Sequence, residues 1–184
     1  MLFRSGGFGI RYRDESPAAI GEFLDGALGV LAGRREMLIV DPGRAIVGEA
    51  GLLLSRIEYV KPGETKNFVI VDAAMNDLIR PALYDAWHDV LPVRQPESGA
   101  PSGVYDIVGP VCESADFLAQ ERTLSPRPGE LLAVMCAGAY GMVMSSNYNS
   151  RPRPAEVMVS GELATLVRER ESVGQLFASE RGLP

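Results

Sequence analysis

The sequence predicts an α+β protein in two parts: the tail of an α/β domain over residues 1–46, and a mainly antiparallel β-barrel or β-sandwich domain with short helices over residues 47–184. Two observations predict this fold class. The first 45 residues follow the order turn, helix, strand, turn, as an α/β repeat does. From Val47 onward, short apolar runs alternate with turns rich in proline, glycine and serine, which is typical of antiparallel barrels and sandwiches.

One helix and one strand are expected in the first part. Ser16 and Pro17 suit the start of a helix, because serine caps free backbone N–H groups and proline is tolerated at the first helical position. Apolar residues then recur at helical spacing as far as Leu31, and Gly33 provides a stop signal. The run "MLIV" (37–40) predicts a short buried strand, and "DPGR" predicts the turn that leaves it.

In the second part we expect short strands joined by turns. "KPGET" predicts a turn before the strand "FVIVDA", and a short helix is expected over Asp77–Tyr84. The C-terminal segment "ATLVRERESVGQLFASE" predicts a charged helix. The other predicted strands lie in "HDVLPV", "GVYDIVGP", "ELLAVMCAGAYG" and "AEVMVSG".

Composition and charge restrict the class of protein. The chain has 184 residues, of which 46% are hydrophobic and 23% charged, as in ordinary globular domains. Its net charge of −6 disfavours nucleic acids and anionic membranes as partners, since phosphate-binding surfaces are basic. The N-terminus lacks the apolar core of a secretory signal, and the longest apolar stretch, residues 131–144, is too short to span a bilayer. We therefore expect a cytoplasmic location.

Few residues of the metal-binding and Schiff-base types are present. Cys112 and Cys136 lack a metal-type spacing and His88 is the only histidine, so no metal site is expected. Two isolated cysteines fit a reducing compartment. Of the 18 basic residues only Lys61 and Lys66 are lysines.

Five short motifs follow one another in order: "GGFGIRYRDE" (6–15), "DPGR" (41–44), "VDAAMNDLIRPALY" (71–84), "GPVCESAD" (109–116) and "AGAYGMVMSSNYNSRPRPAEV" (137–157). Each one alone also fits a structural role, such as a turn, a surface salt bridge or a solvated helix face. Together, in this order, they resemble the C-terminal half of the diaminopimelate decarboxylase family. Those enzymes use pyridoxal 5′-phosphate and have an alanine-racemase-like fold.

The resemblance implies that residues 1–46 are the C-terminal remnant of a TIM-like, cofactor-binding α/β barrel. Gly6 and Gly7 would then form the turn that holds the cofactor phosphate through backbone N–H groups, which glycine leaves unobstructed. Asp41 and Gly43, together with Arg44 and Tyr140, are the other cofactor-binding residues that it implies. Asp41 replaces the usual glutamate that pairs with the pyridinium nitrogen, and it is one methylene shorter.

Substrate-binding residues are implied in the same way. Arg80 and Tyr84 lie four residues apart, so they share one face of a helix, and a guanidinium suits the distal carboxylate of diaminopimelate. Arg44 and Tyr140 would contact the substrate as well as the cofactor. Cys112 and Glu113 match a pair that reaches into the neighbouring subunit's site, where Glu113 would accept from the distal ammonium and Cys112 would donate a proton after CO2 leaves. The resemblance thus implies a homodimer that acts on a small amino acid.

The essential Schiff-base lysine of the family lies far upstream of the region that this sequence matches, and neither Lys61 nor Lys66 occupies a strand end. The sequence is therefore interpreted as the C-terminal part of such an enzyme, and we expect this chain alone to be inactive. Two alternatives stay open. One is a decarboxylase of ornithine, arginine or carboxynorspermidine type; the other is a non-catalytic, decarboxylase-like dimerisation module.

Overall fold

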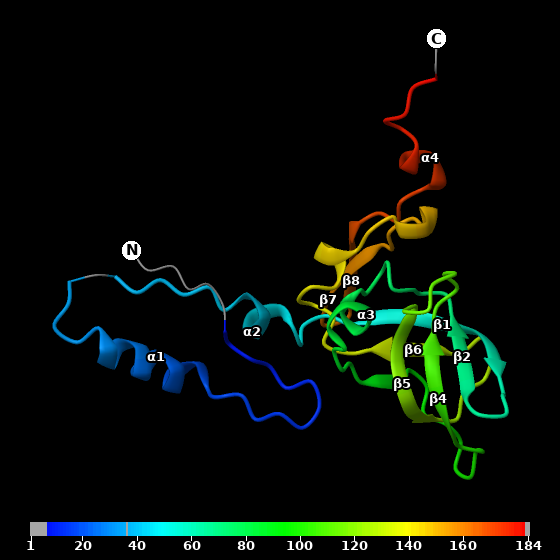
Figure 1. Cartoon of the computed structure of the whole chain (residues 1–184), viewed down its shortest axis with the longest axis horizontal. Helices are drawn as coiled ribbons and strands as arrows, with labels where there is room; N and C mark the ends of the chain where they lie inside the picture. Colours follow the sequence, from blue (N-terminus) through cyan, green and yellow to red (C-terminus); the bar gives the residue numbers. More distant parts are fainter. Residues whose placement is uncertain (1–6, 36, 183–184) are drawn as a thin grey trace.

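The main body of the molecule is a curled six-stranded sheet (Figure 1). The computed structural model describes residues 7–35 and 37–182. The strands lie in the order β3-β6-β1-β2-β4-β5 across the sheet. Their bounds are β1 Leu53–Lys61, β2 Asn67–Val71, β3 Val90–Pro92, β4 Gly103–Val108, β5 Phe117–Leu124 and β6 Leu131–Val134.

The sheet is mixed and almost closes on itself. Neighbouring strands run antiparallel, except for β2 and β4, which are parallel, with Val69 opposite Ile107. The two edge strands, β3 and β5, contact each other, so the sheet forms a nearly closed barrel. Two further strands, β7 (Glu156–Ser160) and β8 (Leu163–Arg168), form a separate exposed hairpin. The expected, mainly antiparallel β structure is confirmed as a nearly closed barrel, in which β2 and β4 form the one parallel pair among the described strands.

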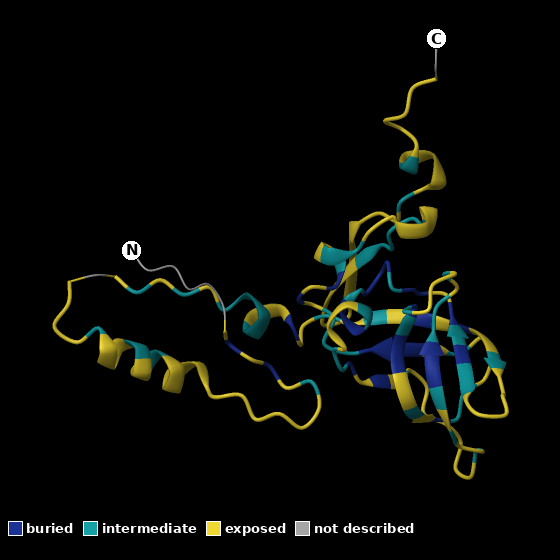
Figure 2. Cartoon of the chain, viewed as in Figure 1, coloured by how far each residue is buried: buried dark blue, intermediate teal, exposed yellow. Residues whose placement is uncertain are grey.

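The core fills the inside of the barrel (Figure 2). Side chains alternate along a strand, so Val69 and Val71 of β2 point inward and are buried, whereas Phe68 and Ile70 are only half-buried. Apolar residues from the other strands join them, and Leu78 enters from the segment that precedes α3. The largest fully buried apolar side chains are Ile57, Leu78, Ile107, Leu118, Val69, Val71 and Val134.

Helices are short and lie outside the barrel. They are α1 (Ile20–Val30), α2 (Gly43–Val47), α3 (Arg80–Tyr84) and α4 (Val173–Leu176). Helix α1 belongs to an N-terminal arm that extends away from the barrel and returns through α2 into β1 (Figure 1). None of its residues is buried, and its Phe23 ring meets the ring of Phe8 at 4.8 Å. Among the described residues, no helix combines the length and the hydropathy needed to cross a membrane.

Several expected elements differ from those observed. Helix α1 begins at Ile20 rather than at Pro17. The predicted strand at 37–40 is wrong: Met37 is 84% exposed, and no described strand lies beside this run to accept its hydrogen bonds. The predicted C-terminal helix is also wrong over most of its length. The chain turns back at Gly161 (φ +59°), between β7 and β8, so that β8 pairs with β7, and only the four residues of α4 are helical.

Candidate active site

Five of the residues singled out in the sequence line one small pocket beside the barrel. Its volume is about 130 Å³, and its walls come from the start of the N-terminal arm, the turn before α2 and the loop after β6. The complete lining is Gly7, Phe8, Asp41, Pro42, Gly43, Arg44 and Tyr140. Gly6, the remaining predicted cofactor residue, lies outside the described residues.

Close backbone contact holds the Tyr140 loop against the segment that follows α2. The N–H of Gly138 donates to the carbonyl of Gly48 at 3.1 Å, and the N–H of Ala137 donates to that of Gly51 at 2.8 Å. A Cβ on Gly138 would collide with the carbonyl oxygen of Val47. Glycine at this position therefore allows the approach that brings Tyr140 to the pocket.

Polar atoms at this site lack partners within the described part of the chain. The Nε of Arg44 and the hydroxyl of Tyr12 are both buried and make no hydrogen bond there. A buried donor without an acceptor is rare in native proteins and needs an explanation, such as a bound ligand. Arg44 lines the pocket, so the residue that carries this unpartnered donor also supplies a positive charge to the pocket wall.

Arg80 is the second cation of the site. It begins α3, next to Pro81, and is only 7% exposed. Its guanidinium carbon lies 4.7 Å from the centre of the Tyr12 ring and 6.0 Å from that of Tyr140. No carboxylate among the described residues forms an ion pair with Arg80, and the single described hydrogen bond of its side chain joins Nη1 to His88 Nε2 at 3.0 Å.

His88 and Tyr12 were missed as site residues in the sequence. His88 is fully buried, its Nδ1 is 2.7 Å from the carbonyl oxygen of Met135, and its ring meets Tyr12 edge-on at 5.4 Å. Burial lowers the pKa of His88, and the cations Arg80 and Arg122 lower it further. These contacts join segments far apart in the chain, so the only sequence signal was that His88 is the single histidine of the chain.

Three other predicted residues lie away from this pocket. Tyr84 is 61% exposed, although it is on the same short helix as Arg80. Cys112 and Glu113 are exposed on the loop between β4 and β5 and do not line the Arg44 pocket. Tyr148 donates from its hydroxyl to Glu113 Oε2 at 3.3 Å, and the negative charge of Glu113 raises the pKa of that tyrosine.

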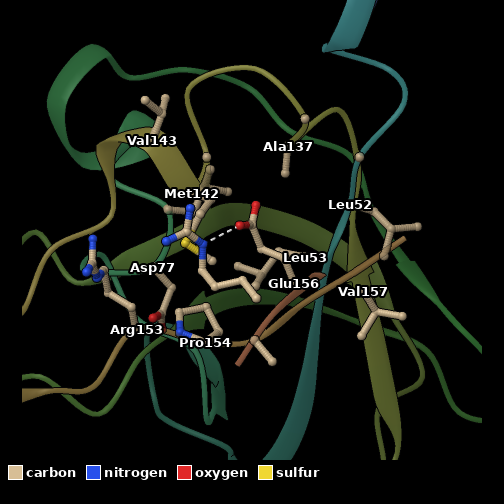
Figure 3. Close-up of a pocket in the computed structure, with 16 residues that line it drawn as sticks. Leu52, Leu53, Asp77, Ala137, Met142, Val143, Arg153, Pro154, Glu156 and Val157 are labelled. Carbon is tan, nitrogen blue, oxygen red and sulfur yellow. Dashed lines mark hydrogen bonds and ion pairs between the residues drawn. The ribbon is translucent and has the colours of Figure 1, made fainter. Parts of the chain in front are cut away.

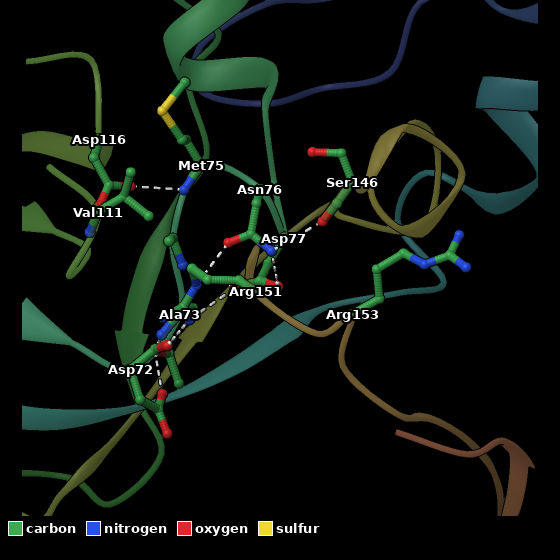
Figure 4. A network of polar contacts seen from close by, with 12 residues as sticks. Asp72, Ala73, Met75, Asn76, Asp77, Val111, Asp116, Ser146, Arg151 and Arg153 are labelled. Atoms are coloured by element: carbon green, nitrogen blue, oxygen red, sulfur yellow. Dashed lines mark hydrogen bonds and ion pairs between the residues drawn. The ribbon is translucent and has the colours of Figure 1, made fainter. Parts of the chain in front are cut away.

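A polar network fixes the loops that carry these residues (Figure 4). Arg151 donates from Nε to Asn76 Oδ1 at 2.8 Å and from Nη2 to the carbonyl of Asp72 at 2.6 Å. Asp116 accepts from the N–H of Met75 and from that of Val111. The segment that leads to α3 is therefore tied both to the Glu113 loop and to the segment after Tyr140.

A larger pocket of about 550 Å³ lies between the β7–β8 hairpin and the barrel (Figure 3). Its acidic and basic groups are compensated internally, because Glu156 pairs with Arg168, and Arg153 pairs with Glu171. The Arg153 guanidinium lowers the pKa of Glu171 to about 2. None of the predicted site residues lines this pocket, so we place the candidate site at Arg44 and Arg80.

Neither lysine lies at the candidate site. Lys66 pairs with Asp106 at 2.8 Å on the side of the barrel, and Lys61 is exposed at the end of β1. Neither of them lines the Arg44 pocket. A Schiff base at this site would therefore need an amine from elsewhere.

Comparison with known proteins gives consistent matches. Residues 23–138 match the family model described as "Pyridoxal-dependent decarboxylase, C-terminal sheet domain". A diaminopimelate decarboxylase of Pseudomonas aeruginosa is 57% identical over 179 residues, and one of Vibrio cholerae is 53% identical over 180 residues; each alignment covers 97% of this chain and 43% of the relative. The chain thus spans less than half the length of these curated relatives.

Solved structures agree with this match. The crystal structure of diaminopimelate decarboxylase from M. jannaschii is 35% identical with a TM-score of 0.90, over 98% of this chain and 42% of that one. The enzyme from Helicobacter pylori, complexed with L-lysine, is 38% identical with a TM-score of 0.87, over 96% of this chain and 43% of that one.

Proposed function

Because this chain belongs to the pyridoxal-dependent decarboxylase family, we propose that it is the C-terminal part of a diaminopimelate decarboxylase. The whole enzyme would remove CO2 from meso-2,6-diaminopimelate to give L-lysine. In this proposal residues 1–46 end a TIM-like α/β barrel, and residues 47–184 form the C-terminal β domain. The bacterial relatives are biosynthetic enzymes by name, which supports a cytoplasmic location.

The observation that carries the proposal is a buried arginine without a counter-ion among the described residues. A buried cation is costly unless an anion is close by, yet Arg80 is 7% exposed and forms no ion pair there. A substrate carboxylate would supply the missing charge, and the planar guanidinium could bind it through two parallel hydrogen bonds. Diaminopimelate has such a group at its far end, whereas ornithine does not.

The Arg44 pocket fits part of a pyridoxal-phosphate site. Arg44 offers a buried donor without a partner, Gly7 (φ +102°) and Gly43 present backbone without side chains, and Tyr140 adds a hydroxyl. Its volume of about 130 Å³ is below the roughly 300–1,000 Å³ of complete ligand sites, so other walls are needed. When bound, the cofactor would accept the electrons left by departing CO2, and Asp41 would help keep its ring nitrogen protonated.

Two of the remaining residues would act from a second subunit. Cys112 and Glu113 are exposed and do not line the Arg44 pocket of their own chain, which supports a site completed by a neighbouring copy. From the second subunit, Glu113 would accept a hydrogen bond from the substrate's distal ammonium and Cys112 would deliver a proton to the reacting carbon. Tyr84 would instead border the distal carboxylate from the same chain as Arg80, whose helix it shares. Because neither Lys61 nor Lys66 is near, this chain alone should release no CO2.

The proposal is tested with the Arg80→Leu variant in the enzyme completed by its N-terminal half. Loss of charge-assisted hydrogen bonds worth about 3 kcal/mol should lower kcat/KM for meso-diaminopimelate roughly 100-fold. CO2 release is the measurement. The exposed Arg94 provides a matched control, and Arg94→Leu should leave the rate unchanged.

Other substrates decide between this proposal and its alternatives. The substrate assignment would be contradicted by two results together. The unmodified enzyme and Arg80→Leu would decarboxylate ornithine or arginine equally well, and both would have little activity on diaminopimelate. A completed enzyme without activity on any amino acid, which still forms stable dimers, would instead indicate a non-catalytic module.

A further inference from the structure

His88 holds Arg80 through a hydrogen bond that only one form of the imidazole can make. Its Nδ1 lies 2.7 Å from the carbonyl oxygen of Met135, and a carbonyl only accepts, so Nδ1 carries the proton. Nε2 then has a free lone pair, which accepts from Nη1 of Arg80 at 3.0 Å. The contact to Met135 thus fixes the tautomer that can receive the arginine.

The surroundings of His88 keep it neutral. The side chain is fully buried, with Arg80 at Nε2, the ring of Tyr12 at 5.4 Å, and the guanidinium of Arg122 donating to the His88 carbonyl at 3.2 Å. The neighbouring carboxylate is that of Asp89, whose Oδ1 accepts a 2.8 Å hydrogen bond from Nε1 of Trp87. Burial and the two cations outweigh the opposing effects of the Met135 hydrogen bond and of Asp89, so the pKa of His88 is lowered.

Two contacts therefore restrain the Arg80 guanidinium. His88 holds Nη1, and the Tyr12 ring lies against the guanidinium at 4.7 Å. Nε and Nη2 have no hydrogen-bond acceptor among the described residues, so these donors remain available. Arginine side chains lose rotamer entropy when they are fixed, and a guanidinium that is already fixed has less to lose on binding.

We infer that His88 is a positioning residue for substrate binding: as a neutral imidazole it orients the Arg80 fork toward the distal carboxylate of a bis-amino acid. The inference rests on the proposed function of Arg80. It gives a specificity role, exerted through Arg80, to a fully buried histidine. Protonation of His88 would remove the acceptor and place a second positive charge beside Arg80.

The contact can be tested by NMR in the 184-residue chain, because His88 is its only histidine. Nitrogen shifts of the imidazole at pH 7 should show a protonated Nδ1 and an unprotonated Nε2. Arg80→Met should move the Nε2 resonance and raise the titration midpoint of His88, while Arg94→Met should do neither. The inference would be overturned, whatever the enzyme's substrate is, if the imidazole were protonated at Nε2 or charged at pH 7. It would also be overturned if Arg80→Met changed neither the Nε2 resonance nor the titration midpoint.

The functional consequence is tested in the completed enzyme. His88→Leu should raise KM for meso-diaminopimelate about tenfold with kcat changed less than threefold, because binding before chemistry is weakened. His88→Gln, whose amide oxygen can accept from Arg80, should recover most of the lost affinity. Equal losses in kcat for both variants, with KM unchanged, would show a merely structural histidine.

The two proposals fail in different ways. If Arg80→Leu has no effect on diaminopimelate turnover, the proposed function of Arg80 is wrong, even when NMR shows the His88 contact. If Arg80→Leu is harmful and His88→Leu leaves KM unchanged, only the positioning role is wrong. The NMR comparison leaves His88 in place, so it remains decisive even if His88→Leu does not fold.

Discussion

Tyr140 joins the two halves of the candidate site at the scale of single residues. Its ring lies 6.0 Å from the Arg80 guanidinium, and the residue also lines the Arg44 pocket. Its backbone has φ +61°, a left-handed conformation that costs a non-glycine residue about 1–3 kcal/mol and that recurs at functional sites. The strained loop therefore places Tyr140 both near Arg80 and in the wall of the Arg44 pocket.

His88 gives the molecule a pH-dependent stability. Its pKa is lowered in the folded state, so between its folded and unfolded pKa values the unfolded chain binds more protons. Its contribution is present above the unfolded value near 6.5 and is lost as the pH falls. Urea unfolding should thus show a larger loss of stability from pH 7 to pH 5 in the wild type than in His88→Gln. Equal losses in the two proteins would contradict this prediction.

At the scale of elements, the segments after α2 and β6 cross at glycines. Gly138→Ala would push its Cβ into the carbonyl of Val47, so it should cost about 2–4 kcal/mol of unfolding free energy. Gly26→Ala is the matched control: no atom lies within 4 Å of its added Cβ in α1, and alanine should stabilise the helix by up to about 1 kcal/mol. Urea denaturation followed by circular dichroism measures both. An unchanged free energy of unfolding in Gly138→Ala would show that the two segments can move apart at this crossing without loss of stability.

Arg151 ties the loop after Tyr140 to the segment that leads into α3. Arg151→Met removes its bonds to Asn76 and to the carbonyl of Asp72, and should cost about 2–3 kcal/mol. Arg127→Met, which removes only an exposed 3.8 Å pair with Glu97, should cost less than about 1 kcal/mol. Chemical denaturation gives both values, and equal losses would contradict the role assigned to the network.

The sequence revealed elements with local signals and missed those set by distant partners. β2 and β4 were predicted because their apolar runs are bounded by turn residues. β5 was missed because its polar residues, such as Gln120 and Glu121, face outward while Leu118 is buried, and its partner strand decides this pattern. At the site, Arg44 and Tyr140 were predicted because their motifs, "DPGR" and "AGAYG", resemble those of the family. The His88–Arg80 contact arises only when β3 reaches its place beside β6.

At the scale of the whole molecule, the proposed site needs two copies. If one protomer supplies Arg80 and its partner supplies Glu113, mixing Arg80→Leu and Glu113→Ala subunits of the completed enzyme restores one intact site in each mixed dimer. Random mixing makes half of the dimers mixed, each with one of two sites, so activity should recover to about a quarter of the wild-type value. Each variant alone provides the control. No recovery after exchange, verified by native mass spectrometry, would show that both residues act within one chain.

The strand order of the barrel has a consequence for biosynthesis. β1 lies at the centre of the sheet and pairs with β6, whose Leu132 meets Ser55, 77 positions earlier in the chain. Ribosomes release the chain from its N-terminus, so β1, β2, β4 and β5 can pair before β6 is available. Closure must wait until β6 has emerged, and such distant pairing folds slowly. The inner face of the sheet, which includes Val69 and Val71, therefore stays incompletely covered while residues 72–134 are being synthesised.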